Sequence, residues 1–424
     1  MYVLATTTTT AENVASAFWS FDRNALELYN TGLDGASFGS PTYTTSFTGY
    51  GAAISFIRSS TQYIYITSRI LPFNLRSFTI EAWIYPIGFS NSNDYGIFGQ
   101  CQAISNNSCL YFIVRNNKLY CGFYFNDLQG VTTLTMNTWY HVACVYDSAT
   151  MTQQVWLNGN LDGSRLASAY DGQWGIITIG ATFHSGSAVA FNGYIDNVRF
   201  EARAKNLTEI LNDATLYVYY SFDDGSPTDN GPNGINGTAS GNLSSTTGRV
   251  NQALQFNSGP YIYYSYTPFY FLGISGYPFS IALWAKPTGS YAAQTLVFIE
   301  KPSGWCVHCL VMTSSGQLVA NNWNGSNVAT NGPIISLNTW IHIGYTYSTT
   351  NGIRLYINGT QYSTTGSFTF SGSGVPMRII LGGNGGRIFS CSPSYGGAFT
   401  GALDEFFLYR RELTAGQVWA LANP

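Results

Sequence analysis

Charged residues are scarce in this chain of 424 amino acids. Asp, Glu, Lys and Arg make up 9% of the sequence, against roughly 25% in typical soluble domains. The formal charge is −3 and no basic stripe is present, which argues against a nucleic-acid-binding surface. The sequence also lacks an apolar run of the roughly 18 residues that a membrane-spanning helix needs. We therefore expect a soluble chain that binds no nucleic acid and has no membrane span.

A secretory signal peptide is not recognisable either. Tyr2-Val3-Leu4-Ala5 precede five threonines, without a basic region or a long apolar core. The expectation of secretion therefore rests on seven cysteines and six Asn-x-Ser/Thr sequons, which fit an oxidising, glycosylating route. We expect a secreted, extracellular glycoprotein. The sequon asparagines are Asn106, Asn206, Asn236, Asn242, Asn324 and Asn358.

Aromatic and small polar residues take the place of the missing charges. Aromatics reach 16% of the chain, and Gly, Ser, Thr and Asn fill much of the rest. This composition suits twisted antiparallel sheets with polar outer faces and tight turns, whereas helices favour Ala, Glu, Lys and Leu. The composition predicts an all-β protein.

The chain repeats itself. Four blocks recur in the same order, with an offset of 201 positions for the first three and 208 for the last. This tandem duplication places a boundary near Asp213 to Leu216. We expect a first domain over residues 17–214, a second over 215–424, and an N-terminal extended strand or tail over 1–16. The blocks are 20–22 with 221–223, 77–86 with 279–287, 134–141 with 336–342, and 191–196 with 399–404.

Within each copy the apolar residues alternate. Phe78, Ile80, Ala82 and Ile84 are separated by single residues, as in a half-buried strand. Asn-Gly pairs at 158–159 and 358–359 follow apolar runs and predict type I′ hairpin turns. Helix is expected only near 208–211 and 414–420, with Thr414 as N-cap of the second. Many short strands with frequent turns predict two tandem jelly-roll β-sandwiches.

The order of these motifs resembles a known family. The motifs are an opening Phe-Asp strand, a Phe-Thr-Ile-Glu-Ala-Trp strand, an Asn-Thr-Trp-x-His strand, a Leu-x-Ile-Asn-Gly hairpin and a closing Gly-x-Ile-Asp strand. Together they look like the concanavalin A-like, laminin-G/pentraxin group, from Ala17 to Asn423. The resemblance implies the sandwich fold. It leaves function open, because this group includes lectins, adhesion modules and domains appended to enzymes.

The acidic residues argue against catalysis. Glycosidases need two carboxyl groups roughly 5–10 Å apart on one face, which on a strand means acids at i and i+2 or i+4. Glu81 stands alone on its strand, and Asp404 and Glu405 are adjacent. His141 and His342 each follow a tryptophan in the repeated motif and are interpreted as structural side chains. The sequence predicts no enzyme activity.

Two pairs of aspartates are candidates for metal binding. Asp22 with Asp196, and Asp223 with Asp404, belong to the first and last strands of each copy, which are neighbours in this fold. Calcium prefers several hard oxygen ligands, and loop carbonyls would complete the shell. The alternative is that these aspartates cap turns by binding backbone amides. Calcium, in a structural role, is the one cofactor considered.

The cysteines divide four and three between the copies. Because no position repeats, disulfides would be local additions, and one thiol is left over in the second copy. The spacing predicts a Cys101–Cys109 bridge, and a bridge from Cys391 to either Cys306 or Cys309. A zinc site is disfavoured because a second pair of ligands is lacking. The cysteines are Cys101, Cys109, Cys121, Cys144, Cys306, Cys309 and Cys391.

The first residues have no counterpart in the second copy. Tyr2, Val3 and Leu4, with the threonines up to residue 10, contain no Gly, Pro or charge and favour extended backbone. The segment is interpreted as an assembly strand that pairs with its own domain or with another molecule, or as a mucin-like tail. Stretches 261–266 and 321–325 combine aromatics and amides, which are suited to sugars, without defining a site.

Two classes of function remain. The first is a non-catalytic extracellular structural or adhesive protein, a filament or matrix subunit that assembles with itself through N-terminal strand addition. The second is a secreted carbohydrate-binding lectin with extracellular glycans or matrix as partners, and a glycoside-acting enzyme is a remote alternative. Low charge, the sequons, the lack of a catalytic cluster and the extra N-terminal strand favour the first class.

Overall fold

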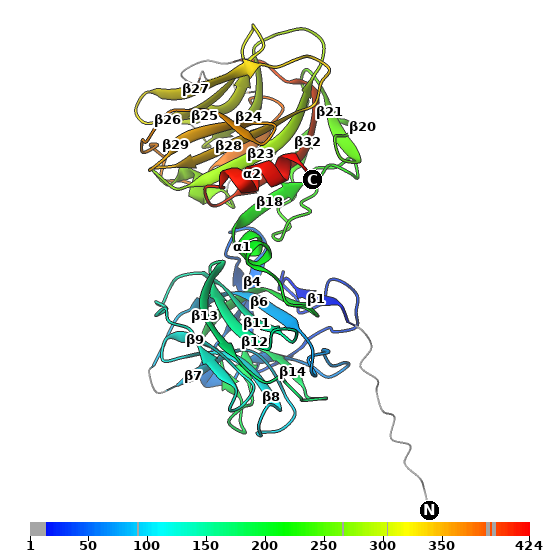
Figure 1. Ribbon diagram of the computed structural model, residues 1–424, viewed down its shortest axis with the longest axis vertical. Helices are drawn as coiled ribbons and strands as arrows, with labels where there is room; N and C mark the ends of the chain where they lie inside the picture. The colour runs from blue at the N-terminus through cyan, green and yellow to red at the C-terminus, as the bar shows by residue number, and fades with distance from the viewer. Residues whose placement is uncertain (1–13, 91–92, 265–266, 303, 387–390, 392–395) are drawn as a thin grey trace, which may run out of the picture. The chain divides into compact units, whose positions relative to one another are not determined.

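The computed structural model describes the chain except for residues 1–13, 91–92, 265–266, 303, 387–390 and 392–395. The chain divides into two compact units, unit 1 (Met1–Ala214) and unit 2 (Thr215–Pro424). Both are built almost entirely of antiparallel strands (Figure 1). Within the described residues, no helix has the length and apolar character needed to cross a membrane.

Unit 1 is a sandwich of two sheets, named here after a central strand of each. The β6 sheet has the order β13 (Asn160–Leu166), β12 (Thr152–Leu157), β11 (Tyr140–Asp147), β6 (Phe78–Pro86), β17 (Gly193–Glu201), β4 (Ala52–Phe56) and β3 (Thr42–Thr45), with β1 (Ser16–Trp19) also on β17. The β7 sheet has the order β10 (Asp127–Gln129), β9 (Lys118–Gly122), β8 (Cys109–Arg115), β7 (Asp94–Cys101), β14 (Ile177–Ile179), β5 (Tyr63–Ile66) and β2 (Ala36–Phe38). The smaller elements are β15 (Ala181–Thr182) paired with β16 (Val189–Ala190), the 3-10 turn η1 (Arg58–Ser60), and α1 (Leu207–Thr215).

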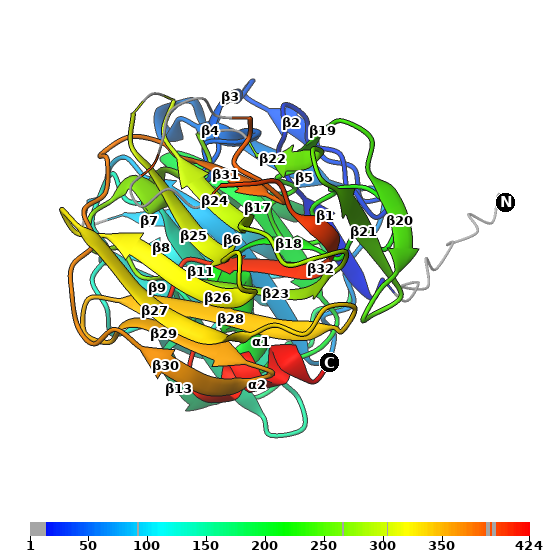
Figure 2. The ribbon, with the colours of Figure 1, turned by 90° about the horizontal axis from the view of Figure 1, so that it is seen from above.

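Unit 2 repeats this plan. The β23 sheet has the order β20 (Ser244–Thr247), β21 (Gln252–Asn257), β32 (Thr400–Tyr409), β23 (Phe279–Pro287), β28 (Ile341–Ser348), β29 (Gly352–Ile357) and β30 (Thr360–Thr364), with β18 (Leu216–Tyr220) on β32. The β24 sheet has the order β19 (Thr238–Ser240), β22 (Tyr261–Tyr263), β31 (Arg378–Leu381), β24 (Gln294–Glu300), β25 (Cys306–Met312), β26 (Gln317–Trp323) and β27 (Asn327–Ile334). The helical elements are η2 (Tyr270–Gly273) and α2 (Ala415–Ala422), which lies beside β30 (Figure 2).

The alternating pattern on β6 explains its place in the sandwich. Phe78, Ile80, Ala82 and Ile84 are fully buried in a core cluster to which both sheets of unit 1 contribute. On the other face of the strand, Trp83 pairs with residues of β11 and β17, and Trp284 has the same pairing in unit 2. The prediction of two tandem jelly-roll sandwiches is confirmed.

Hairpin turns and helix ends follow local chemistry. Asn158-Gly159 and Asn358-Gly359 have positive φ at both residues, as type I′ turns require. Thr414 caps α2, and its hydroxyl accepts a hydrogen bond from the Gln417 amide as part of a capping box. α1 begins at Leu207, where Asn206 and Glu209 form a reciprocal cap, and it continues to Thr215, beyond the predicted 208–211.

Candidate functional site

Asp22 and Asp196 are brought together in unit 1. Asp22 follows β1, which pairs with β17, the strand that carries Asp196. Oδ1 of Asp22 accepts a hydrogen bond of 2.7 Å from the Ala52 amide, and Oδ2 of Asp196 accepts one of 3.3 Å from the Phe47 amide. Burial, reinforced by repulsion from Asp22, raises the pKa of Asp196 to about 7. Asp196 is almost fully buried and Asp22 is exposed, so a buried acidic group lies beside one that reaches solvent.

Asp223 and Asp404 form the equivalent pair in unit 2. Oδ2 of Asp404 accepts hydrogen bonds from the amides of Arg249 (2.7 Å) and Val250 (3.0 Å), and Oδ1 of Asp223 accepts one from the Gln252 amide (3.1 Å). Burial, with a contribution from Asp223, raises the pKa of Asp404 to about 6. The two aspartates of each predicted pair are thus close enough to repel each other, and each pair also accepts hydrogen bonds from backbone amides, as the turn-capping alternative requires.

The donor set of these pairs fits a hard cation. Oδ1 of Asp404 is buried and accepts no hydrogen bond from the described residues. Two carboxylates that repel each other would both be stabilised by a shared divalent ion. Among the described residues, no group of three or more His, Cys, Asp or Glu side chains is placed to hold a metal. Main-chain carbonyl oxygens would therefore have to supply the remaining ligands.

A β-bulge follows the aspartate of the last strand in each unit. The register of β17 shifts after Asp196, and the next residue, Asn197, has φ +46°. The register of β32 shifts in the same way after Asp404, and Glu405 has φ +50°. Bulges change the direction of nearby side chains and recur next to functional sites. The duplicated bulge is a feature of the acidic end that the sequence pattern did not reveal.

The histidines of the repeated motif are structural. The ring of His141 packs against Trp83 at 5.4 Å between centroids, and that of His342 against Trp284 at 5.3 Å. Burial lowers the pKa of His141 to about 3 and that of His342 to about 4. Both imidazoles are therefore neutral at physiological pH and fill the sheet surface.

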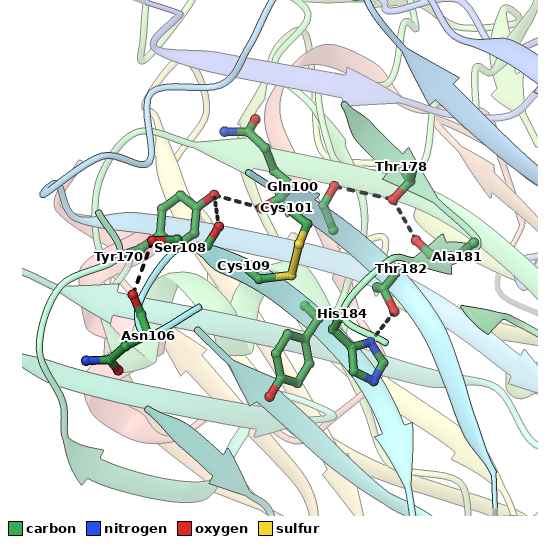
Figure 3. The surroundings of a disulfide bond; sticks show 12 residues. Gln100, Cys101, Asn106, Ser108, Cys109, Tyr170, Thr178, Ala181, Thr182 and His184 are labelled. Atoms are coloured by element: carbon green, nitrogen blue, oxygen red, sulfur yellow. Dashed lines mark hydrogen bonds between the residues drawn. A yellow bond between two sulfur atoms is a disulfide. The ribbon is translucent and has the colours of Figure 1, made fainter. Parts of the chain in front are cut away.

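Three disulfides are formed by the described cysteines. Cys101–Cys109 joins β7 to β8 (Figure 3), and Cys121–Cys144 ties the β7 sheet to the β6 sheet. In unit 2, Cys391 pairs with Cys306, one of the two partners that the spacing allowed. Cys309 is the remaining free thiol, and its burial makes it inaccessible for bonding to another chain.

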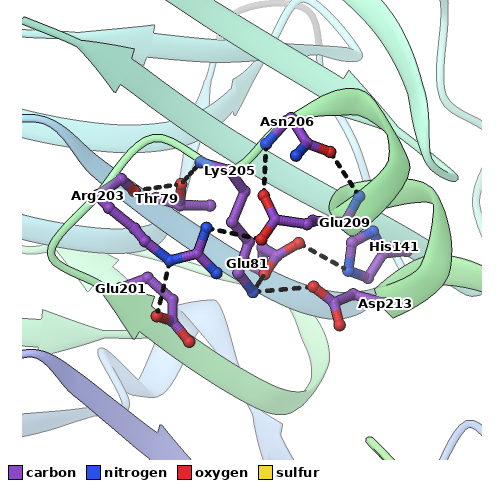
Figure 4. Close-up of polar contacts among 9 residues, drawn as sticks. All are labelled: Thr79, Glu81, His141, Glu201, Arg203, Lys205, Asn206, Glu209 and Asp213. Carbon is purple, nitrogen blue, oxygen red and sulfur yellow. Dashed lines mark hydrogen bonds and ion pairs between the residues drawn. The ribbon is translucent and has the colours of Figure 1, made fainter. Parts of the chain in front are cut away.

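An ionic cluster under α1 was not foreseen from the sequence (Figure 4). Nζ of Lys205 donates hydrogen bonds to Glu81 and to Asp213, the latter at 2.8 Å. Nε2 of His141 lies 3.7 Å from the other oxygen of Glu81. Burial, with repulsion from Asp213, raises the pKa of Glu81, and the ammonium group of Lys205 acts in the opposite direction. Glu81 is the one acidic residue of β6. The other charged members of the cluster, Lys205 and Asp213, follow it by 124 and 132 positions in the sequence.

The other residues predicted to form sites are in part exposed, in part buried and in part outside the described residues. All six sequon asparagines are exposed. Asn321 and Asn322 of the aromatic, amide-rich stretch are buried, and Asn322 donates to the Tyr345 hydroxyl, so neither amide is available to a sugar. Residues 265–266 of the other such stretch lie outside the described residues, as does the assembly strand with Tyr2, Val3 and Leu4.

Comparison with known proteins identifies the family. Residues 58–211 and 258–419 each match the laminin G family described as the concanavalin A-like lectin/glucanases superfamily. Because the two matches cover more than half of the chain, the chain belongs to this family. No curated protein sequence matches it.

Similar solved structures come from several sources. Domain 4 of AbnA, a GH43 extracellular arabinanase from Geobacillus stearothermophilus in complex with arabinotriose, shares 22% identity over 49% of this chain and 98% of that chain, with a TM-score of 0.36. The binding domain of Paraclostridial Mosquitocidal Protein 1 shares 20% identity over 50% of this chain and 52% of its own length (TM-score 0.38). Domains LG4-5 of the mouse laminin alpha1 chain share 13% identity over 80% and 85% of the two chains (TM-score 0.29). This chain thus spans about half of the mosquitocidal binding domain.

Proposed function

We propose that this is a non-catalytic extracellular adhesive protein whose subunits join through the edges of their sheets. The observation that carries the proposal is the chemistry of the outermost strands. Among the described strands, β2, β3, β19, β20 and β30 each end a sheet and contain neither a charged residue nor a proline. Most of their residues are exposed.

Uncharged edges are unusual in a protein that stays monomeric. An edge strand presents N–H and C=O groups to any passing strand, and soluble proteins usually block it with Lys, Pro or an inward-pointing charge. β3 consists of Thr-Tyr-Thr-Thr and β20 of Ser-Ser-Thr-Thr, so neither has such a block. These edges support strand addition between molecules.

The proposed donor is the segment of residues 2–10, which is itself uncharged and rich in threonine. Its pairing with β3 of another molecule would be a head-to-tail contact, because donor and acceptor surfaces differ. Such contacts give a filament unless rotation closes them into a ring. The donor and the edge lie on the same chain, so a single gene product would suffice for assembly.

The burial of the acidic residues supports a non-catalytic role. Glu81, Asp196 and Asp404 have exposed fractions of 1%, 1% and 0%. Glycoside hydrolysis needs two carboxyl groups that reach the sugar. Because one carboxyl group of each aspartate pair is buried, the pairs favour a structural function. Three disulfides favour an oxidising, extracellular location.

Sedimentation velocity of the full chain tests the proposal. We expect concentration-dependent oligomers, reduced to monomers both by deletion of residues 1–12 and by the double substitution Thr42→Lys/Thr45→Lys on β3. Ala149→Lys adds positive charge at the exposed turn between β11 and β12, neither of which ends the sheet, and should sediment like the wild type. A wild-type chain that is monomeric at every concentration would overturn the proposal.

A further inference from the structure

Five aromatic side chains gather on the outer side of the β6 sheet in unit 1, and we call them the aromatic face. The ring of Phe47 stacks on that of Trp83 at 4.0 Å between centroids, and Tyr85 stacks on Tyr194 at 5.2 Å. Trp139 joins the two stacks, because its ring lies 6.1 Å from that of Phe47 and 5.3 Å from that of Tyr85. Trp83 is buried, whereas the other four residues are partly exposed, so the aromatic face is open to solvent.

Unit 2 has equivalent tryptophans, and each of them lies under a cation of the chain itself. Trp284 and Trp340 follow the two tryptophans of the aromatic face by 201 positions. The guanidinium carbon of Arg249 lies 4.8 Å from the centre of the Trp284 ring, and Nζ of Lys286 lies 5.9 Å from that of Trp340. Aromatic rings attract cations to their negative faces at such distances. Unit 2 thus shows which kind of group settles on these two rings.

The two cations of unit 2 occupy the positions of two aromatic residues in unit 1. Phe47 and Arg249 each lie two residues after the outermost strand of their sheet, and the amide of each donates a hydrogen bond to the equivalent aspartate of the last strand. Tyr85 and Lys286 each follow the strand tryptophan by two residues and pair with the equivalent residue of the last strand. Unit 1 therefore keeps both tryptophans and has further rings where unit 2 has its cations.

Negative charge borders the aromatic face. Asp196 accepts a hydrogen bond from the Phe47 amide, and the exposed Asp22 lies close enough to Asp196 to repel its carboxylate. A carboxylate beside ring faces attracts a cation and repels an anion. The charge next to the rings therefore favours the same kind of ligand as the rings do.

The angles between the rings suit a side chain that has both a flat cation and an apolar stem. The planes of Phe47 and Tyr85 make angles of 64° and 52° with that of Trp139. A guanidinium group is planar and stacks on one ring, while its methylene stem packs against the next. We propose that the aromatic face of unit 1 binds an arginine-bearing segment of a partner protein, which supplies the cation that unit 2 carries itself. This inference rests on the proposed adhesive role and names the chemistry of a partner for it.

Calorimetric titration of the full chain tests the aromatic face with two probes. One is a capped peptide with two arginines among glycines and serines, and the other is the same peptide with citrulline in place of each arginine. Citrulline keeps the planar shape of the side chain and loses its charge. A chelator in the buffer keeps divalent cations away from Asp22. We expect the arginine peptide to bind at least about tenfold more tightly than the citrulline peptide.

Trp139→Ala should weaken binding of the arginine peptide by roughly tenfold or more, without any change in the charge of the protein. Trp340→Ala is the matched control, because it removes the equivalent ring of unit 2, which Lys286 already covers. This control should bind the arginine peptide like the wild type. Thermal unfolding of both variants shows that each is folded.

A second variant tests the aromatic face with side chains that the fold accommodates at the same positions in unit 2. Phe47→Arg/Tyr85→Lys places the cations of unit 2 on the rings of unit 1 and should abolish the preference for the arginine peptide. Failure of the arginine peptide to bind, equal affinity for the two peptides, or wild-type binding by Trp139→Ala or by the double variant would overturn the assignment. Sedimentation of the chain is a separate readout, so a chain that forms oligomers without binding the peptide loses this site alone, and a monomeric chain that binds the peptide loses the sheet-edge joint alone.

Discussion

The ammonium group of Lys205 donates a hydrogen bond to a carboxylate oxygen of Glu81, and both side chains are almost fully buried. In unit 2, Leu413 occupies the position of Lys205, and Ala282 occupies the position of Glu81. The correspondence is secured by backbone contacts: the Lys205 amide donates to the Thr79 hydroxyl at 2.9 Å, and the Leu413 amide donates to a hydroxyl at the same distance. The same pair of positions thus holds an ion pair in unit 1 and two apolar side chains in unit 2.

This relationship predicts that the two single substitutions lower the free energy of unfolding by different amounts and that the double substitution does not lower it. Lys205→Leu leaves Glu81 buried without its cation and should lower the free energy of unfolding by about 3–5 kcal/mol. Glu81→Ala should cost less, because Lys205 keeps Asp213 at 2.8 Å. The double variant Glu81→Ala/Lys205→Leu, which copies unit 2, should be as stable as the wild type or more stable.

Urea unfolding of the full chain measures each variant. Additive losses in the double variant would contradict the prediction, since they would mean that each residue acts alone. A destabilised double variant would also show that the helix α1 depends on the ion pair rather than on its apolar contacts, among which are those of Ile210 with Trp156.

The shared fold was accessible from the sequence because its signals are local or repeated. The alternation on β6, the Asn-Gly turns at 158–159 and 358–359, and Thr414 as a helix cap each depend on neighbouring residues. Because the chain is duplicated, each motif occurs twice, and each occurrence independently indicates the same local structure. The C-terminal part of α1, up to Thr215, was not predicted, although Ile210 and Ala214 have the i, i+4 spacing of a buried helix face.

The ionic cluster and the aromatic face were not accessible in the same way. Glu81 meets Lys205 only because β6 and the segment before α1 fold together, and the aromatic face gathers rings from four distant segments. A signal for the cluster did exist: when the two copies are aligned, Glu replaces Ala282 and Lys replaces Leu413 together. A paired change of opposite charges at apolar positions indicates contact.

The raised pKa of Asp196 predicts how a variant responds to pH. The folded value is about 7, above the ordinary value of 3.8, so the folded state holds a proton that the unfolded state has lost between pH 4 and 7. This group therefore contributes less stability as pH rises through that window. Asp196→Asn removes the titration and keeps an oxygen that can accept a hydrogen bond from the Phe47 amide.

In chelator, Asp196→Asn should gain stability relative to the wild type between pH 4.5 and 8, by at most about 4 kcal/mol. Thermal unfolding of both proteins across this range measures the difference. Taking the difference removes the opposite contribution of His141 and His342, whose lowered pKa values destabilise the fold as pH falls. A constant difference at all pH values would contradict the raised pKa.

The exposed sequons predict N-linked glycan on the protein when a secretory host produces it. Asn236 and Asn242 are the strongest candidates, because both are exposed in a loop region rich in Gly, Asn and Ser. Enzymatic deglycosylation should lower the mass of protein produced by a secretory host. Asn236→Gln/Asn242→Gln should remove part of that change, and a mass unaffected by deglycosylation would refute the prediction.

Calcium binding at the two aspartate pairs is the last prediction. Calcium would neutralise the repulsion between Asp22 and Asp196, and between Asp223 and Asp404, and would give the buried Oδ1 of Asp404 a partner. A ligand that binds only the folded state stabilises it by about 2.7 kcal/mol at a concentration 100 times its Kd. We expect calcium, compared with chelator, to raise the unfolding temperature at pH 8.

The effect should shrink at pH 5, where a pKa of about 7 keeps Asp196 protonated and unable to bind a cation. Asp404→Asn should remove the contribution of unit 2. Asp224→Asn changes an exposed acid next to the pair, whose carboxylate binds Ser226, and should leave the calcium effect intact. Identical unfolding temperatures in calcium and chelator at pH 8 would show that the aspartates serve only to hold the backbone amides of their turns, because a shared ion would necessarily stabilise the folded state.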